Sequence, residues 1–279
     1  ETAEELERRR RIRLSRRLPP VYGREALKLT AAEKAAHGAE GRKPHWRFLL
    51  PNFAGDPFAP ARTEVHWDDV VRGPQTVDLA SMSDPVLIRE DGLFLYTLPS
   101  VVDDIEMAIT HVIRGAGHLS NTPKQALLFD ALGAPRPRFA HLPMVLGADR
   151  RKLSKREGAR GVRLLREEGF LPDAVVNYLS LLGWSPGDDR EILTREELIR
   201  ELSLDRVGAS DTVFDEEKLR WVSGQHLATL SLEALVEAVE PYLDRSRFPL
   251  EGESLARAVA AIRSRLQVLG DVNPALALL

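Results

Sequence analysis

A short basic loop offers the clearest chemistry in this sequence. Lys152, Ser154, Lys155 and Arg156 lie within five consecutive residues, and glycines flank them on both sides. Ammonium groups and a hydroxyl, on a stretch with neither helix nor strand periodicity, suit a segment that closes over a polyphosphate. A solvated surface loop is the alternative, because basic runs often serve only solubility.

A pair of glycines marks a second candidate site. Gly115 and Gly117 follow a predicted strand and precede a predicted helix, which is the context of a dinucleotide-binding loop. Ser120 takes the place of the third glycine, and no acidic residue ends a following strand to hold a ribose. A tight turn that uses the backbone freedom of glycine is therefore favoured over a nicotinamide or flavin dehydrogenase.

Histidines and paired carboxylates give no metal or hydrolase motif. His111, His118 and His141 recur near the ends of predicted strands, where they can meet in space. Their spacing fits no paired metal-ligand motif, and no serine-centred glycine elbow occurs. Asp103 and Asp104 are adjacent on a predicted helix, so their side chains point about 100° apart. A solvated helix face or a cap is favoured for them, and no metal site is predicted.

An arginine-rich helix opens the sequence. Thr2 and Glu5 have the spacing of a capping box, and Pro19 and Pro20 end the segment. Its basic residues either form a solvated face or contact a phosphate backbone, and the segment alone leaves both interpretations open. The arginines proposed to contact RNA are Arg9, Arg10, Arg13, Arg16 and Arg17.

The composition limits the classes of protein that need to be considered. The 279 residues are enough for two or three domains, with 43% hydrophobic and 29% charged residues. A net charge of −3 means that any nucleic-acid site must be a local patch. The sequence has no cysteine, which excludes disulfides and thiolate zinc sites. No apolar run approaches the roughly 20 residues of a membrane helix and no secretory signal occurs, so we expect a cytoplasmic protein without a membrane partner.

The elements that must position these residues change character along the chain. Residues 1–95 combine the first helix with short β-rich runs at 46–50, 63–67, 85–88 and 93–96, separated by turn signals such as Gly73-Pro74. Residues 96–148 alternate helix, strand, helix and strand, which is typical of half of a parallel, doubly wound sheet. The sequence after the basic loop is helical, and the predicted helices cover 172–182, a segment capped by Thr194, 215–222, 231–243 and 254–269.

Together these segments resemble the class I glutamyl-tRNA synthetases, most closely the bacterial members. The matching blocks occur in the family's order and at its spacing, and the resemblance covers nearly the whole chain. They are Tyr96–Asp104, Ile109–Gly115, His118–Gln125, Phe139–Pro143 and Lys152–Arg156, with further support from Leu18–Tyr22, Pro44–Phe48 and Glu217–Trp221.

The resemblance implies roles for individual residues. Lys152, Ser154 and Lys155 match the second signature loop of the family, in which Lys155 would lie on the phosphates of ATP while glutamate attacks the α-phosphorus. Gly117 and His118 match positions at the ATP site. The residues that match the glutamate pocket are Tyr96, Ser100 and Arg114.

The resemblance also implies a fold class and partners. It predicts α/β plus all-α architecture, in which an α+β connective insertion at 1–95 grips the tRNA acceptor stem. The second half of a Rossmann-like catalytic domain follows at 96–148. The signature loop and a helical stem-contact region occupy 149–230, and an anticodon-binding region begins at 231–279. ATP with Mg²⁺, glutamate and tRNA(Glu) are the implied substrates, and no zinc is expected.

Three departures from the family leave an alternative open. The opening strand and the His-Ile-Gly-His type signature are not in this sequence, and neither is the end of the anticodon-binding region. Gly117 stands where the family usually has an acidic residue, and Ala116 where it often has another. We therefore expect weak or no ligase activity of the isolated chain, with the N-terminal half as a partner. A non-catalytic tRNA-binding fragment or paralogue is the alternative, and the choice between tRNA(Glu) and tRNA(Gln) stays open.

Overall fold

The protein divides into two compact units, Glu1–His141 and Leu142–Leu279. A computed structural model describes residues 2–17, 20–59, 61–153 and 161–279. The first unit contains a mixed sheet with helices, and the second is mainly helical, as the predicted α/β plus all-α class requires. The four-part division expected from the sequence is finer than these two units.

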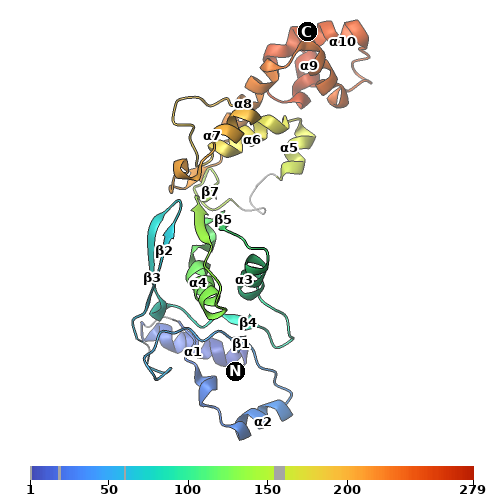
Figure 1. Cartoon of the computed structure of the whole chain (residues 1–279). Helices are drawn as coiled ribbons and strands as arrows, with labels where there is room; N and C mark the ends of the chain where they lie inside the picture. Colours follow the sequence, from blue (N-terminus) through green and yellow to red (C-terminus); the bar gives the residue numbers. More distant parts are fainter. Residues whose placement is uncertain (1, 18–19, 60, 154–160) are drawn as a thin grey trace. The chain divides into compact units, whose positions relative to one another are not determined.

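A four-stranded sheet with strand order β3-β2-β6-β5 organises the first unit (Figure 1). β2 pairs antiparallel with β3 and parallel with β6, where Asp69 lies opposite Phe139. The hairpin of β2 and β3, which belongs to residues 1–95, therefore adds two strands to the sheet that contains β5 and β6 of residues 96–148. The strands are β2 (Glu64–Asp69), β3 (Gly73–Asp78), β5 (His111–Gly115) and β6 (Arg138–Leu142).

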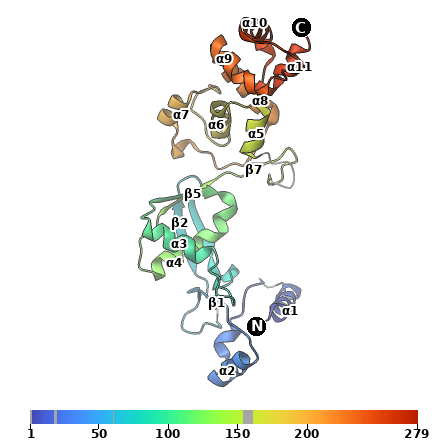
Figure 2. The same ribbon diagram turned by 90° about the vertical axis from the view of Figure 1, so that its right-hand side faces the viewer.

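Two helices cover one face of this sheet (Figure 2). They are α3 (Thr97–Glu106) and α4 (Thr122–Ala131), joined to β5 by the 3-10 segment η3 (Ala116–Asn121). Trp67 of β2 and Phe139 of β6 pack in one core with Val101 of α3 and Phe129 of α4. β2 alternates exposed and buried residues, and its buried face ends in the carboxylate of Asp69.

A buried arginine joins loop segments that lie before β2 and after β3 in the sequence. Arg24 has only 6% of its surface exposed, and its guanidinium pairs with Asp84 at 2.8 Å. It also donates to the carbonyl oxygens of Pro57 at 2.9 Å and Leu50 at 3.0 Å. The other elements of the first unit are α1 (Ala3–Ser15), η1 (Glu25–Lys28), α2 (Ala31–Ala39), β1 (Trp46–Arg47), η2 (Leu79–Ser81) and β4 (Val86–Ile88).

The described part of the second unit has two large helical cores and a small third one of Trp184, Leu193 and Leu198. Leu165, Tyr178 and Val222 belong to the first, and Leu235 and Val259 to the second. A short parallel pair joins β7 (Val145–Leu146) to β8 (Thr212–Val213). The helices are α5 (Val162–Glu168), α6 (Pro172–Leu181), α7 (Arg195–Glu201), η4 (Leu204–Arg206), α8 (Glu216–Thr229), α9 (Leu232–Val239), η5 (Glu240–Tyr242), α10 (Gly252–Ile262), η6 (Arg263–Arg265), η7 (Leu269–Asp271) and α11 (Val272–Leu276).

Most of the predicted elements are confirmed, with several local errors, among them the helix predicted at 254–269, which ends at Ile262. The capping box of Thr2 and Glu5 is present. The turn signalled by Gly73 and Pro74 is present, because Gly73 has a left-handed φ of 68° where the β2–β3 hairpin turn ends, but β3 itself was not predicted. Pro74 is compatible with β3 because β3 is an edge strand. The run predicted as a strand at 93–96 forms only an isolated bridge from Phe94 to Ile88, and the run at 46–50 forms a strand over two residues.

Candidate functional site

Arg114, near the end of β5, is the centre of a polar cluster in the first unit. Its Nε donates to Nε2 of His141 at 3.2 Å, and its Nη2 donates to the hydroxyl of Thr122 at 2.7 Å. Its Nη1 lies 3.4 Å from the hydroxyl of Tyr96. The guanidinium carbon lies 5.8 Å from the ring centre of Phe139. Four contacts, two of them from β6, therefore fix the orientation of this half-buried cation.

The first turn of α3 supplies the other two residues predicted for glutamate. Tyr96 immediately precedes the helix, and its carbonyl accepts the N–H of Ser100 at 3.1 Å, so the two lie one turn apart. Ser100 Oγ accepts a hydrogen bond from Nε2 of the buried Gln125 at 2.9 Å. The structure therefore brings Tyr96 and Arg114 into contact and places Ser100 one turn along α3 from Tyr96.

The segment predicted for ATP borders the same cluster. His118 lies in η3, and its ring centre is 5.9 Å from that of Tyr96. Gly117 precedes it and is exposed. The expectation of a tight turn that needs the backbone freedom of glycine is wrong for Gly115, because its φ of −66° suits any residue. A Cβ at Gly115 would meet no atom within 4 Å.

A buried Asp–His pair completes the cluster, and only its histidine was singled out from the sequence. His141 and Asp69 have side chains that are 0% exposed, and Nδ1 of the histidine bonds Oδ2 of the aspartate. Burial would raise the pKa of Asp69, but hydrogen bonds from the His141 ring and from the N–H groups of His141 and Arg72 outweigh it, so this pKa is lowered. Burial lowers the pKa of His141, and the positive charges of Arg114 and Arg72 lower it further. The hydrogen bond and negative charge of Asp69 raise this pKa, but they do not outweigh burial.

The three histidines expected to meet do not form one hydrogen-bonded group. His141 bonds Arg114, whereas His118 packs on the Tyr96 ring. His111 contacts the hydroxyl of its neighbour Thr110 at 3.0 Å. The pairing of His141 with Asp69 joins residues 72 positions apart, a separation at which sequence periodicity carries no information.

The basic loop lies partly outside the described residues. Ser154 and Lys155 belong to that part, so the structure places neither. Lys152 is exposed and bridges to Leu146 of β7. It lines a hollow of about 860 Å³ between residues 147–153 and residues 213–217. Lys152 is thus held at the rim of an open hollow beside the start of α8.

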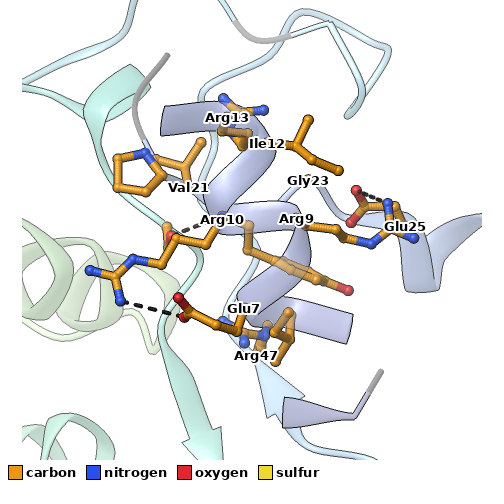
Figure 3. Close-up of a pocket in the computed structure, with 13 residues that line it drawn as sticks. Glu7, Arg9, Arg10, Ile12, Arg13, Val21, Gly23, Glu25 and Arg47 are labelled. Carbon is orange, nitrogen blue, oxygen red and sulfur yellow. Dashed lines mark hydrogen bonds and ion pairs between the residues drawn. The ribbon is translucent and has the colours of Figure 1, made fainter. Parts of the chain in front are cut away.

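The arginine-rich helix borders a second pocket, of about 500 Å³ (Figure 3). Arg9 pairs with Glu25 at 2.9 Å, and Arg10 lies 3.7 Å from Glu7. Arg13 lines the same pocket. Four arginines and two glutamates line the pocket, so its lining is basic even with these ion pairs counted.

The end of α1 extends the basic surface. Arg16 caps the helix and Arg17 follows with a left-handed φ of 56°, and both side chains are exposed. Arg47, which also lines the pocket, lies over the Tyr22 ring, with its guanidinium carbon 4.3 Å from the ring centre. All five arginines predicted for RNA therefore belong to α1 or to the two residues that follow it.

Among residues 2–17, 20–59, 61–153 and 161–279, no group of three His, Cys, Asp or Glu side chains has an arrangement that could hold a metal ion. Within the same ranges, no helix combines the length and the apolar character needed to cross a membrane.

Comparison with curated proteins gives two informative relatives. Glutamate–tRNA ligase 1 of Chelativorans sp. (strain BNC1) is 57% identical over 238 residues, which cover 84% of this chain and 51% of that protein. Glutamate–tRNA ligase 1 of Brucella ovis is 67% identical over 185 residues, which cover 66% of this chain and 40% of that protein. The chain thus spans about half the length, or less, of these relatives.

Solved structures and protein families agree with this result. A glutamate tRNA ligase from Elizabethkingia meningosepticum, in complex with its amino acid, superposes with a TM-score of 0.83 at 29% identity over 98% of this chain and 58% of that one. A glutamate-tRNA synthetase from Elizabethkingia anophelis gives a TM-score of 0.84 at 29% identity, over 98% and 59%. The family described as "tRNA synthetases class I (E and Q), catalytic domain" matches residues 1–221. Because this match covers well over half of the 279 residues, the chain belongs to the class I tRNA synthetases of the E and Q group.

Proposed function

We propose that this chain carries the glutamate pocket and the signature loop of a glutamate–tRNA ligase. In the proposed reaction the glutamate carboxylate attacks the α-phosphorus of ATP, which gives glutamyl-adenylate and releases pyrophosphate. The terminal hydroxyl of tRNA(Glu) then attacks the activated carbonyl and displaces AMP. The oriented guanidinium of Arg114 beside Tyr96 is the observation that carries this proposal.

Arg114 is suited to bind a carboxylate of the amino acid. A guanidinium has five N–H groups, and the contacts with His141, Thr122 and Tyr96 occupy three of them. The remaining N–H groups are fixed in direction by those contacts and can bind a carboxylate as a fork. Tyr96 and Ser100 add hydroxyls from the first turn of α3.

ATP is the second substrate, and the proposal assigns its phosphates to the basic loop. Lys155 would stabilise the charge that develops on pyrophosphate in the transition state, with Lys152 and Ser154 as further donors. Gly117 and His118 would border the nucleotide next to Tyr96. Mg²⁺ is expected to accompany the ATP phosphates.

The tRNA acceptor stem is the proposed ligand of the arginine-rich helix. Arg9, Arg10 and Arg13 face the 500 Å³ pocket, and Arg16 and Arg17 extend the basic surface. Guanidinium groups bind phosphate oxygens without reading the sequence, so this surface would orient the tRNA. Residues 1–95 are proposed as the connective insertion and 96–148 as part of the catalytic domain. The stem-contact region is proposed for 149–230 and the start of the anticodon-binding region for 231–279.

Glutamate-dependent exchange of pyrophosphate into ATP tests the proposal. It is measured on the 279-residue chain alone and on the chain supplemented with the part of the Chelativorans relative that the chain does not match. Exchange in either arrangement that requires L-glutamate supports the ligase. Binding of tRNA(Glu) without exchange in both arrangements would instead support a non-catalytic tRNA-binding protein.

A further inference from the structure

His141 connects the carboxylate of Asp69 to the guanidinium of Arg114. Both the histidine and the aspartate are fully buried. Nδ1 of the imidazole bonds Asp69 Oδ2, and Nε2 faces Nε of Arg114 at 3.2 Å. The hydroxyl of Thr122 contacts both side chains, since it lies 3.0 Å from Nε2 of His141 and accepts a hydrogen bond from Nη2 of Arg114 at 2.7 Å.

The surroundings fix which ring nitrogen carries the proton. Asp69 is an acceptor at both oxygens, because Oδ1 also receives the N–H groups of His141 at 3.0 Å, Val71 at 3.2 Å and Arg72 at 3.1 Å. Nδ1 of His141 must therefore donate to this carboxylate. Arg114 has only donors, so Nε2 must be unprotonated in order to accept from it. The histidine is thus neutral, with its proton on Nδ1.

We propose that Asp69 and His141 are positioning residues that hold Arg114 in the orientation required to bind the glutamate carboxylate. This inference rests on the proposed function of Arg114. Asp69 fixes the tautomer of His141, and the free lone pair on Nε2 holds the Nε edge of the guanidinium. The two N–H groups of Arg114 that His141, Thr122 and Tyr96 do not occupy are thereby left to the substrate. Neither residue touches the substrate in this arrangement.

The arrangement makes glutamate binding dependent on pH. The groups that face His141 are Asp69 and Arg72 from β2 and the turn after it, Arg114 from β5 and the neutral hydroxyl of Thr122 from α4. Protonation of Nε2 would remove the acceptor and place a second cation 3.2 Å from Arg114. Glutamate affinity should therefore fall on acidification, as His141 takes up a proton.

Imidazole nitrogen shifts of the full chain test the tautomer without any substrate. For the native protein at pH 7.5, we expect a protonated Nδ1 and an unprotonated Nε2 on His141, together with a slowly exchanging Nε–H on Arg114. In Asp69→Asn the amide can donate to Nδ1, so the proton should move to Nε2 and the Arg114 Nε–H should exchange rapidly. Protonated Nε2 in the native protein would overturn the proposal.

Glutamate affinity tests the consequence of this geometry. Asp69→Asn should weaken glutamate binding by roughly 10- to 100-fold, the cost that loss of an orienting partner has at metal sites, while the KM for ATP stays unchanged. Asp130→Asn is the matched control, because Asp130 also bonds a nitrogen-bearing side chain, that of Arg136, but is exposed at the opposite end of α4 from Thr122. Equal glutamate affinity in the two variants would refute the positioning role.

A conservative variant separates positioning from a merely structural role. His141→Gln retains an amide oxygen that can accept from Arg114, so it should bind glutamate more tightly than His141→Phe and should lose the pH dependence between about pH 5 and 8. An unchanged pH profile in His141→Gln would contradict the proposal. If the native protein binds no glutamate, the proposed function fails, and the nitrogen and Arg114 Nε–H signals alone decide whether Asp69 and His141 orient the guanidinium.

Discussion

The buried pair of Arg24 and Asp84 should be the most sensitive point of the first unit. Their side chains are 7% and 3% exposed. Arg24→Met keeps most of the side-chain volume and leaves the strain of the left-handed φ of 63° unchanged, since both residues have a Cβ. It also leaves the carboxylate of Asp84 buried without its countercharge.

The expected cost follows from burial. Removing one partner of a buried ion pair costs about 3–5 kcal/mol, which is a large part of the roughly 5–15 kcal/mol that stabilises a domain. Adding Asp84→Leu should recover only part of the loss, because Asp84 also accepts the backbone N–H of Leu50 at 2.9 Å. That orphaned donor costs about 1–3 kcal/mol.

Urea-dependent hydrogen exchange of peptides from β2 and β3 measures this effect within the first unit. Arg62→Met is the control, because Arg62 is 79% exposed and pairs with Glu64 on the surface. Its cost should stay within about 1 kcal/mol. If Arg24→Met lowers the free energy of unfolding no more than Arg62→Met does, the reasoning about the buried pair is wrong.

Three further predictions concern pH, a buried hydroxyl and the basic helix. Burial lowers the pKa of His141 and of His226, so the stabilising contribution of the two neutral side chains is complete above about pH 6.5. This contribution is lost as the pH falls through the folded pKa values. Urea unfolding at pH 7.5 and pH 5.5 should show the loss of stability, and His226→Gln should make the loss smaller. Tyr178→Phe removes a hydroxyl that accepts a backbone N–H at 2.7 Å, and it should cost about 1–3 kcal/mol in urea unfolding, whereas no change would mean that water replaces the bond. Arg10→Gln should lower the slope of log K against log salt for tRNA binding by about 1, and Arg62→Gln should not; equal slopes would remove Arg10 from the RNA surface.

The sequence predicted the local elements because their signals are local. Thr2 and Glu5 predict the cap of α1 by their spacing alone, and Pro172 correctly predicts the first turn of α6. β3 was missed because Gly73 and Pro74 signal a turn in any context, and only the position of β3 at the sheet edge makes them compatible with a strand.

The residues of the candidate site could be predicted only where they lie in the blocks of sequence that resemble the family. Tyr96 and Arg114 were identified through the family resemblance, and the structure places them in contact. Asp69 was missed, because its role depends on pairing between β2 and β6 and on a histidine far away in the sequence. Sequence patterns report which face of a strand is buried, but they do not report which buried polar groups meet.

The dependence of pyrophosphate exchange on the amino acid tests the central claim most directly. Exchange is measured against increasing L-glutamate, L-glutamine and L-aspartate in the complemented protein and in its Arg114→Ala variant. We predict exchange with glutamate only, and a KM for glutamate that Arg114→Ala raises by about 10- to 150-fold, which corresponds to the roughly 1.5–3 kcal/mol of a hydrogen bond to a charged group. Exchange that does not depend on glutamate, or an unchanged KM in Arg114→Ala, would contradict the account.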